Sequence, residues 1–176
     1  MAMRFLILVT IWSLLSGITP GWADEPTPAE LNQLRLYVPI PQLEDRFGKD
    51  VQPLASYIKA LEKRAAEILG QEKRPAAKGL LIAVGIKAKT KTRIWCQGVE
   101  GEVPAELLQR LEKQLAKIEA VDLKKAPAGF AMEIRLFGQK PAKYPEFPDS
   151  WMEAAKKSET KLLLPPDDLF EIIWPD

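Results

Sequence analysis

Residues 79–98 have the sequence GLLIAVGIKAKTKTRIWCQG, in which two apolar runs flank a polar centre. The first run, 80–86, is rich in Leu, Ile and Val, and the second, 92–98, holds Ile, Trp and Cys side by side, so both favour strands. Residues 87–91, between the runs, are Lys, Ala and Thr and suit a turn. The stretch therefore predicts a β-hairpin.

Amphipathic helices are predicted on both sides of this hairpin. Residues 52–69 repeat apolar side chains at helical spacing between Asp50, a suitable N-terminal cap, and Gly70, a suitable stop. A second helix is expected to begin at Pro104, and Glu106 in its first turn suits the helix dipole. The apolar positions are Leu54, Ile58, Leu61, Ala65, Ile68 and Leu69 in the first helix and Leu108, Leu111, Leu115 and Ile118 in the second.

A third strand follows the second helix. In residues 130–137, Phe, Met, Ile and Leu point one way while Ala, Glu, Arg and Phe point the other. Because a helix joins strands 92–98 and 130–137, these two should run parallel, with strand 80–86 antiparallel between them. We therefore expect an α+β fold: a three-stranded antiparallel sheet in the order 2-1-3, packed against two helices, with 130–137 at an edge.

Two irregular, Pro-rich extensions are expected to flank a core of residues 51–138. Residues 24–50 form an N-terminal arm, in which 28–36 has the spacing of a short helix. Residues 139–176 are broken by prolines, with one short helix at 149–157. This C-terminal extension is too apolar to stay disordered, so we expect it to dock on the core.

The chain begins with a predicted export signal. Arg4 supplies a positive charge, residues 5–18 are mainly apolar, and small residues at Gly21 and Ala23 suit cleavage after Ala23. The apolar run is shorter than the roughly 20 residues of a spanning helix, which disfavours the alternative of a retained anchor. Residues 1–23 are therefore predicted to be a cleavable signal peptide, and the product to be periplasmic or secreted without stable membrane insertion.

Charge and residue types exclude several classes of function. The chain has 25 Lys and Arg against 24 Asp and Glu, and the signal removes only Arg4, so the exported part is neutral and has no bulk attraction for nucleic acid. It has no histidine, which excludes Ser-His and Cys-His catalysis and His-ligated metals. Cys96, the lone cysteine, suits a buried apolar position, the alternative being a reactive or intermolecular thiol. We expect no catalytic residue, no metal and no cofactor.

The ββαβ order of residues 79–138, with a short hairpin, a Leu-rich helix and an alternating final strand, is similar to the C-terminal domain of the TonB/TolA family of envelope proteins. The resemblance implies capture of an envelope protein or peptide segment by strand addition along 129–138. Phe130, Glu133 and Arg135 would then line the binding edge.

A second candidate surface lies on the hairpin. Lys87, Lys89, Lys91 and Arg93 alternate, so an extended hairpin would project all four from one face. They suit either an anionic lipid or polysaccharide, or a solubilising hairpin tip. Trp95 shares the parity of Arg93, and is either a platform for a sugar or peptide or a residue packed under the aromatic side chains of the tail, namely Trp151, Phe170 or Trp174.

Together these features favour an exported, non-catalytic binding protein of the bacterial periplasm that acts through a sheet edge or an exposed Trp/Arg strand face. One alternative is a small envelope hydrolase. Its chemistry would come from Ser158, spaced from Lys161 as in S-x-x-K enzymes, or from Asp167 and Asp168. Another alternative is an envelope assembly or scaffold subunit, which would self-associate. The identity of the partner and the oligomeric state stay open.

Overall fold

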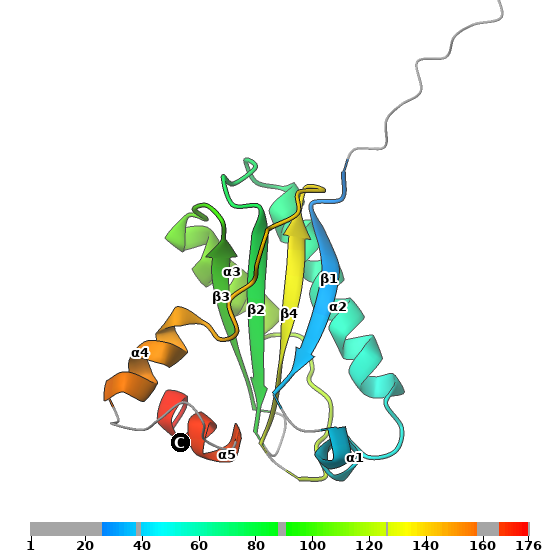
Figure 1. The fold of residues 1–176 in the computed structure, drawn as a ribbon. Coiled ribbons are helices and arrows are strands. Elements are labelled where there is room, and N and C mark those ends of the chain that lie inside the picture. Colours follow the sequence, from blue (N-terminus) through cyan, green and yellow to red (C-terminus); the bar gives the residue numbers. More distant parts are fainter. Residues whose placement is uncertain (1–25, 38–39, 88–90, 126, 158–165, 176) are drawn as a thin grey trace, which may run out of the picture.

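The computed structural model describes residues 26–37, 40–87, 91–125, 127–157 and 166–175. Its strands form one antiparallel sheet in the order β1-β4-β2-β3, with α2 and α3 on one face and α4, α5 and the segment before α4 on the other (Figure 1). None of the described helices is long and apolar enough to span a membrane. In chain order the elements are β1 (Ala29–Leu36), α1 (Ile40–Phe47), α2 (Gln52–Gly70), β2 (Gly79–Ile86), β3 (Thr92–Val99), α3 (Ala105–Leu115), β4 (Ala128–Leu136), α4 (Asp149–Lys157) and α5 (Pro166–Ile173).

The α+β class and the central hairpin are confirmed. β2 and β3 pair in an unbroken register that ends at Ile86 opposite Thr92, and β4 pairs with the other side of β2. The three expected strands therefore have the expected relative order. α2 and α3 lie where helices were predicted, and Asp50 Oδ1 accepts the N–H of Gln52 at 2.9 Å at the start of α2.

The sheet also has a fourth strand, formed by residues expected to be helical. Ala29–Leu36 make β1, which pairs with β4. A bulge just after Leu31 adds one residue to the strand, so Leu31, Leu34 and Leu36 all pack against the same core although the first two are three positions apart. The prediction of a helix over 28–36 is therefore wrong. It arose because a spacing of three between apolar residues is also typical of a helix.

The fourth strand changes which part of the sheet is an edge. β4 lies between β1 and β2, so residues 129–138 are not an edge, and the edge strands are β1 and β3. The expected three-stranded sheet is therefore a four-stranded one. The N-terminal arm supplies β1 and α1 to the fold, instead of being irregular throughout.

Two crossover units interlock in this sheet. β1, α2 and β2 form one unit with β4 between its strands, while β3, α3 and β4 form the other with β2 between its strands. Neither unit can complete its sheet without the other. Both crossover helices pack over one core, whose fully buried side chains include Leu61, Leu69, Leu80, Ile82, Leu111 and Phe130.

Aromatic side chains close the opposite face of the sheet. Trp95 of β3 is 8% exposed, and its ring centroid lies 5.0 Å from that of Trp151 in α4. Phe170 of α5 lies over Gly85 and Gly129, because a Cβ atom at either glycine would collide with its ring. The C-terminal helices therefore pack on the central strands. Gly85 and Gly129 have no side chain, and this leaves the room that the Phe170 ring occupies.

Candidate functional site

The residues expected along an edge of β4 do not share a surface. Phe130 is fully buried in the core beneath α2. Glu133 is 3% exposed and pairs with Arg35 of β1, whereas Arg135 pairs with Glu30 at 2.6 Å. Since β4 is paired on both sides, it cannot accept an added strand. The predicted binding edge is therefore wrong.

Two of the four basic residues expected on the hairpin face, Lys87 and Arg93, lie against the C-terminal tail. Lys87 Nζ is 5.2 Å from the centre of the Trp174 ring, and the Arg93 guanidinium is 5.2 Å from the centre of the Trp95 ring. Arg93 Nη1 also donates to the Ile173 carbonyl at 3.5 Å, at the end of α5, where a cation suits the helix dipole. These two cations therefore pack on the tail instead of projecting as a ladder.

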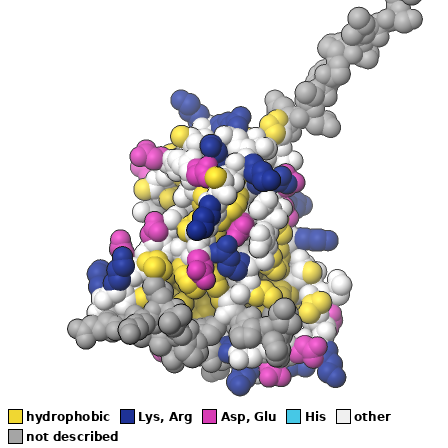
Figure 2. Space-filling model, viewed as in Figure 1, with side chains coloured by type: hydrophobic (Ala, Val, Ile, Leu, Met, Phe, Trp, Pro, Cys, Tyr) yellow, Lys and Arg dark blue, Asp and Glu magenta, His cyan; other side chains and the backbone are white. Residues whose placement is uncertain are grey.

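The expected Trp/Arg face is not an exposed platform either, because α4 and α5 cover Trp95. Lys91 is exposed, and Lys89 lies outside the described residues. Figure 2 shows this side of the molecule, where charged side chains of both signs are interspersed with apolar ones.

The residues proposed for a hydrolase site lie largely outside the part of the chain that the structure describes. Ser158 and Lys161 are not among the described residues. Asp167 and Asp168 fall in the first turn of α5, but the structure describes nothing of their side chains. The hydrolase alternative therefore stays a prediction from the sequence.

Cys96 is buried in β3. Burial, and after it the nearby Glu112 carboxylate, raises the pKa of the thiol well above its ordinary value, so the reactive thiolate is disfavoured. Among the described residues, no group of Cys, Asp and Glu side chains is arranged to hold a metal ion.

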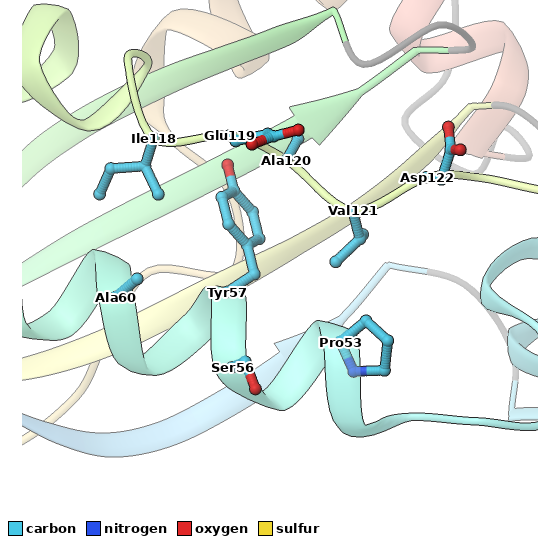
Figure 3. A pocket seen from close by; sticks show the side chains of 9 residues that line it. All are labelled: Pro53, Ser56, Tyr57, Ala60, Ile118, Glu119, Ala120, Val121 and Asp122. Atoms are coloured by element: carbon cyan, nitrogen blue, oxygen red, sulfur yellow. The ribbon is translucent and has the colours of Figure 1, made fainter.

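The structure adds a candidate site that the sequence did not indicate, a groove between α2 and residues 118–122. Its volume is about 430 Å³. Figure 3 shows Ile118 and Val121 pointing toward α2 and the Tyr57 ring rising from α2, while the Asp122 carboxylate points away. The floor of the groove is therefore apolar. The lining residues are Pro53, Ser56, Tyr57, Ala60, Ile118, Glu119, Ala120, Val121 and Asp122.

Local sequence builds both walls of the groove. Pro53 is tolerated because it lies in the first turn of α2, where a backbone N–H has no helical acceptor. α3 ends at Leu115, whose carbonyl accepts the Ile118 N–H at 3.0 Å in a tight final turn. Val121, 9% exposed, then anchors the connection to the core.

Tyr57 and two carboxylates define the polarity of the groove. Tyr57 is 4% exposed, and burial raises its pKa to about 12, although the nearby Thr92 side chain acts in the opposite direction. The phenol therefore stays neutral at physiological pH. Glu119 and Asp122 are exposed and place negative charge at the rim. The arrangement suits an apolar group that carries a cation beside it.

Two exposed apolar residues of α2, Pro53 and Ala60, line the groove. Val51, which directly precedes α2, is 45% exposed but is not among the lining residues. Sequence reasoning missed this site because residues 116–127 have no periodic pattern.

No protein-family model, no curated protein and no solved structure matches this chain. The resemblance to the TonB/TolA family therefore stays a prediction, and the strand that it made the binding edge lies inside the sheet. The case for the groove rests on its own geometry.

Proposed function

We propose that this is an exported, non-catalytic protein that binds an apolar, Lys- or Arg-containing segment of an envelope protein in the groove between α2 and residues 118–122. The observation that carries the proposal is the groove of about 430 Å³ between α2 and residues 118–122, in which Ile118 and Val121 point toward α2 and give the groove an apolar floor. An apolar depression with polar groups around it is the usual form of a site for a small ligand or peptide.

The rim supports a basic residue in the bound segment. Glu119 and Asp122 are both exposed and lie on the same wall, three positions apart in the sequence. Exposed charges of this kind contribute to orientation and association rate more than to affinity. The apolar floor would supply the affinity, and the two carboxylates would select a segment with a nearby cation.

The chemistry of the groove supports binding over turnover. The raised pKa of Tyr57 makes the phenol reluctant to lose its proton, so it is a poor base or nucleophile near neutral pH. Ser56 is exposed on α2, and in Figure 3 its hydroxyl points away from the groove. Neither hydroxyl is therefore presented as an activated group.

Site-specific crosslinking in the native envelope would identify the partner. A photoreactive amino acid at Ala60, which lines the groove, is compared with one at Lys63, which is also exposed on α2 but does not line the groove. We expect an envelope protein to be captured from position 60 and not from position 63. Equal capture from both positions would contradict a specific site.

Binding is then measured with the purified chain and a peptide from the crosslinked segment. Ala60→Arg places a bulky cation in the groove and should weaken binding at least tenfold. Ala105→Arg, an equal change at an exposed position at the start of α3, should leave affinity within twofold. Unchanged affinity in Ala60→Arg would exclude the groove as the site.

A further inference from the structure

The two edges of the sheet carry the same feature. An edge strand turns every second residue's N–H and C=O away from its partner, and these groups can pair with a strand from another molecule. β1 and β3 are the edge strands here. On each of them, a glutamate from the crossover helix behind the sheet holds one outward-facing N–H.

On β3 this outward N–H belongs to Cys96. The Lys87 N–H donates to the Lys91 carbonyl at 2.8 Å where β2 passes into β3, and the register then places the hydrogen-bonded pairs at alternate residues of β3. Cys96 falls between these pairs and directs its N–H away from β2. It donates to Glu112 Oε1 of α3 at 2.8 Å.

On β1 the corresponding group is the N–H of Leu31. It donates to Glu62 Oε1 of α2 at 2.7 Å. The bulge in β1 follows directly, so the register of this edge is also broken at this point. β3 has no such irregularity in its pairing with β2, and its outer side is therefore the straighter template for another strand.

We infer that Glu62 and Glu112 close both edges of the sheet against pairing with a second copy of this chain. Each carboxylate occupies a donor that an incoming strand would need, in a charge-assisted hydrogen bond, and it presents negative charge to incoming carbonyl oxygens. A second copy is the relevant partner because two identical antiparallel edges are self-complementary about a twofold axis. Because β3 lacks a bulge, Glu112 should matter more than Glu62.

The test uses residues 24–176 with Glu112→Ala, Glu62→Ala and the double substitution. Matched controls are Glu106→Ala on α3 and Glu67→Ala on α2, both exposed glutamates. Sedimentation velocity over a hundredfold range of concentration should show self-association of Glu112→Ala and stronger association of the double variant. Wild type and both controls should stay monomeric. A monomeric double variant would overturn the inference, as would equal association of the controls.

Amide hydrogen exchange provides an independent readout. In dilute, monomeric protein the Cys96 amide should exchange at least tenfold faster in Glu112→Ala, and the Leu31 amide should do so in Glu62→Ala. Glu112→Gln keeps an acceptor oxygen and should retain slow exchange and the monomeric state. If Glu112→Ala does not fold, Glu112→Leu, with a side chain of similar length and good helix propensity, replaces it. Unchanged exchange at Cys96, or wild-type chains that pair through β3, would overturn the inference.

Discussion

The docking of α5 on the sheet can be tested by adding one methyl group at Gly129. A Cβ atom there would overlap Phe170 Cζ and lie 2.8 Å from Phe170 Cε2. Gly129 is not among the glycines with positive φ, so its backbone accepts alanine without strain. The penalty then comes from the collision alone, and overpacking of this kind costs about 1–3 kcal/mol. We expect Gly129→Ala to lower the free energy of unfolding by that amount.

A double-mutant cycle shows whether the Phe170 ring is the cause. Phe170 is 1% exposed, and Phe170→Ala should cost about 3–5 kcal/mol through lost burial and the cavity left behind. Once the ring is gone, the methyl at position 129 enters vacated space. The double variant should therefore lose at least about 1 kcal/mol less than the two single changes predict together.

Urea denaturation followed by tryptophan fluorescence suits this measurement. Outside the predicted signal peptide the tryptophans are Trp95, Trp151 and Trp174, and all of them belong to the aromatic cluster around Phe170. Their emission should shift in Gly129→Ala, whereas far-ultraviolet circular dichroism should stay close to wild type.

Gly70→Ala is the control for the cycle. It lies at the end of α2, where an added Cβ would meet only Pro28 Cγ at 3.3 Å, and it should be neutral or stabilising by up to about 1 kcal/mol. The reasoning is refuted if Gly129→Ala leaves stability within about 0.5 kcal/mol of wild type. It is also refuted if the same substitution costs as much in the Phe170→Ala background.

Three further predictions concern buried polar groups. Tyr57 ionises near pH 12 in the fold against 10 in an ordinary environment, so stability should fall between about pH 10 and 12 by up to ~3 kcal/mol, and Tyr57→Phe should remove this part of the decline in urea titrations. Cys96 should react with a thiol reagent at pH 8 only as fast as the protein opens, and rapid reaction of the native protein would show that the site is not closed. Glu133→Gln should cost about 1–3 kcal/mol, because Arg35 loses its charged acceptor while its side chain stays partly covered; an unchanged urea midpoint would mean that the pair contributes nothing net.

The elements that could be predicted are those whose signal lies within a few consecutive residues. The apolar runs at 80–86 and 92–98, the helical repeat of 52–69 and the alternation of 130–137 all appear in the structure. Each pattern records which side of one element faces the core. β1 was not predicted as a strand, because its bulge gives Leu31 and Leu34 a helical spacing. The bulge is a feature of the pairing with β4, so the sequence of the strand alone does not show it.

The candidate site shows the same division. The alternation of side chains along a strand correctly placed Lys87, Arg93 and Trp95 on one face of the hairpin. The sequence left open whether that face is exposed to solvent or covered by the C-terminal extension. Phe170 and Trp174 cover it from positions about eighty residues away, and no local pattern records such a contact. The groove is likewise formed by two segments, 53–60 and 118–122, that are unremarkable separately.

For this chain, local sequence was enough to predict the α+β class, the hairpin and both crossover helices. The signals for them, which are apolar periodicity and the residues that begin or end a helix, act over a few positions. Long-range contacts set which strands are edges, what shields Trp95 and where an apolar groove stays open. The bonds from Leu31 to Glu62 and from Cys96 to Glu112 illustrate the reason. Each joins residues on different elements, so it comes into being only when the chain has packed and those elements meet.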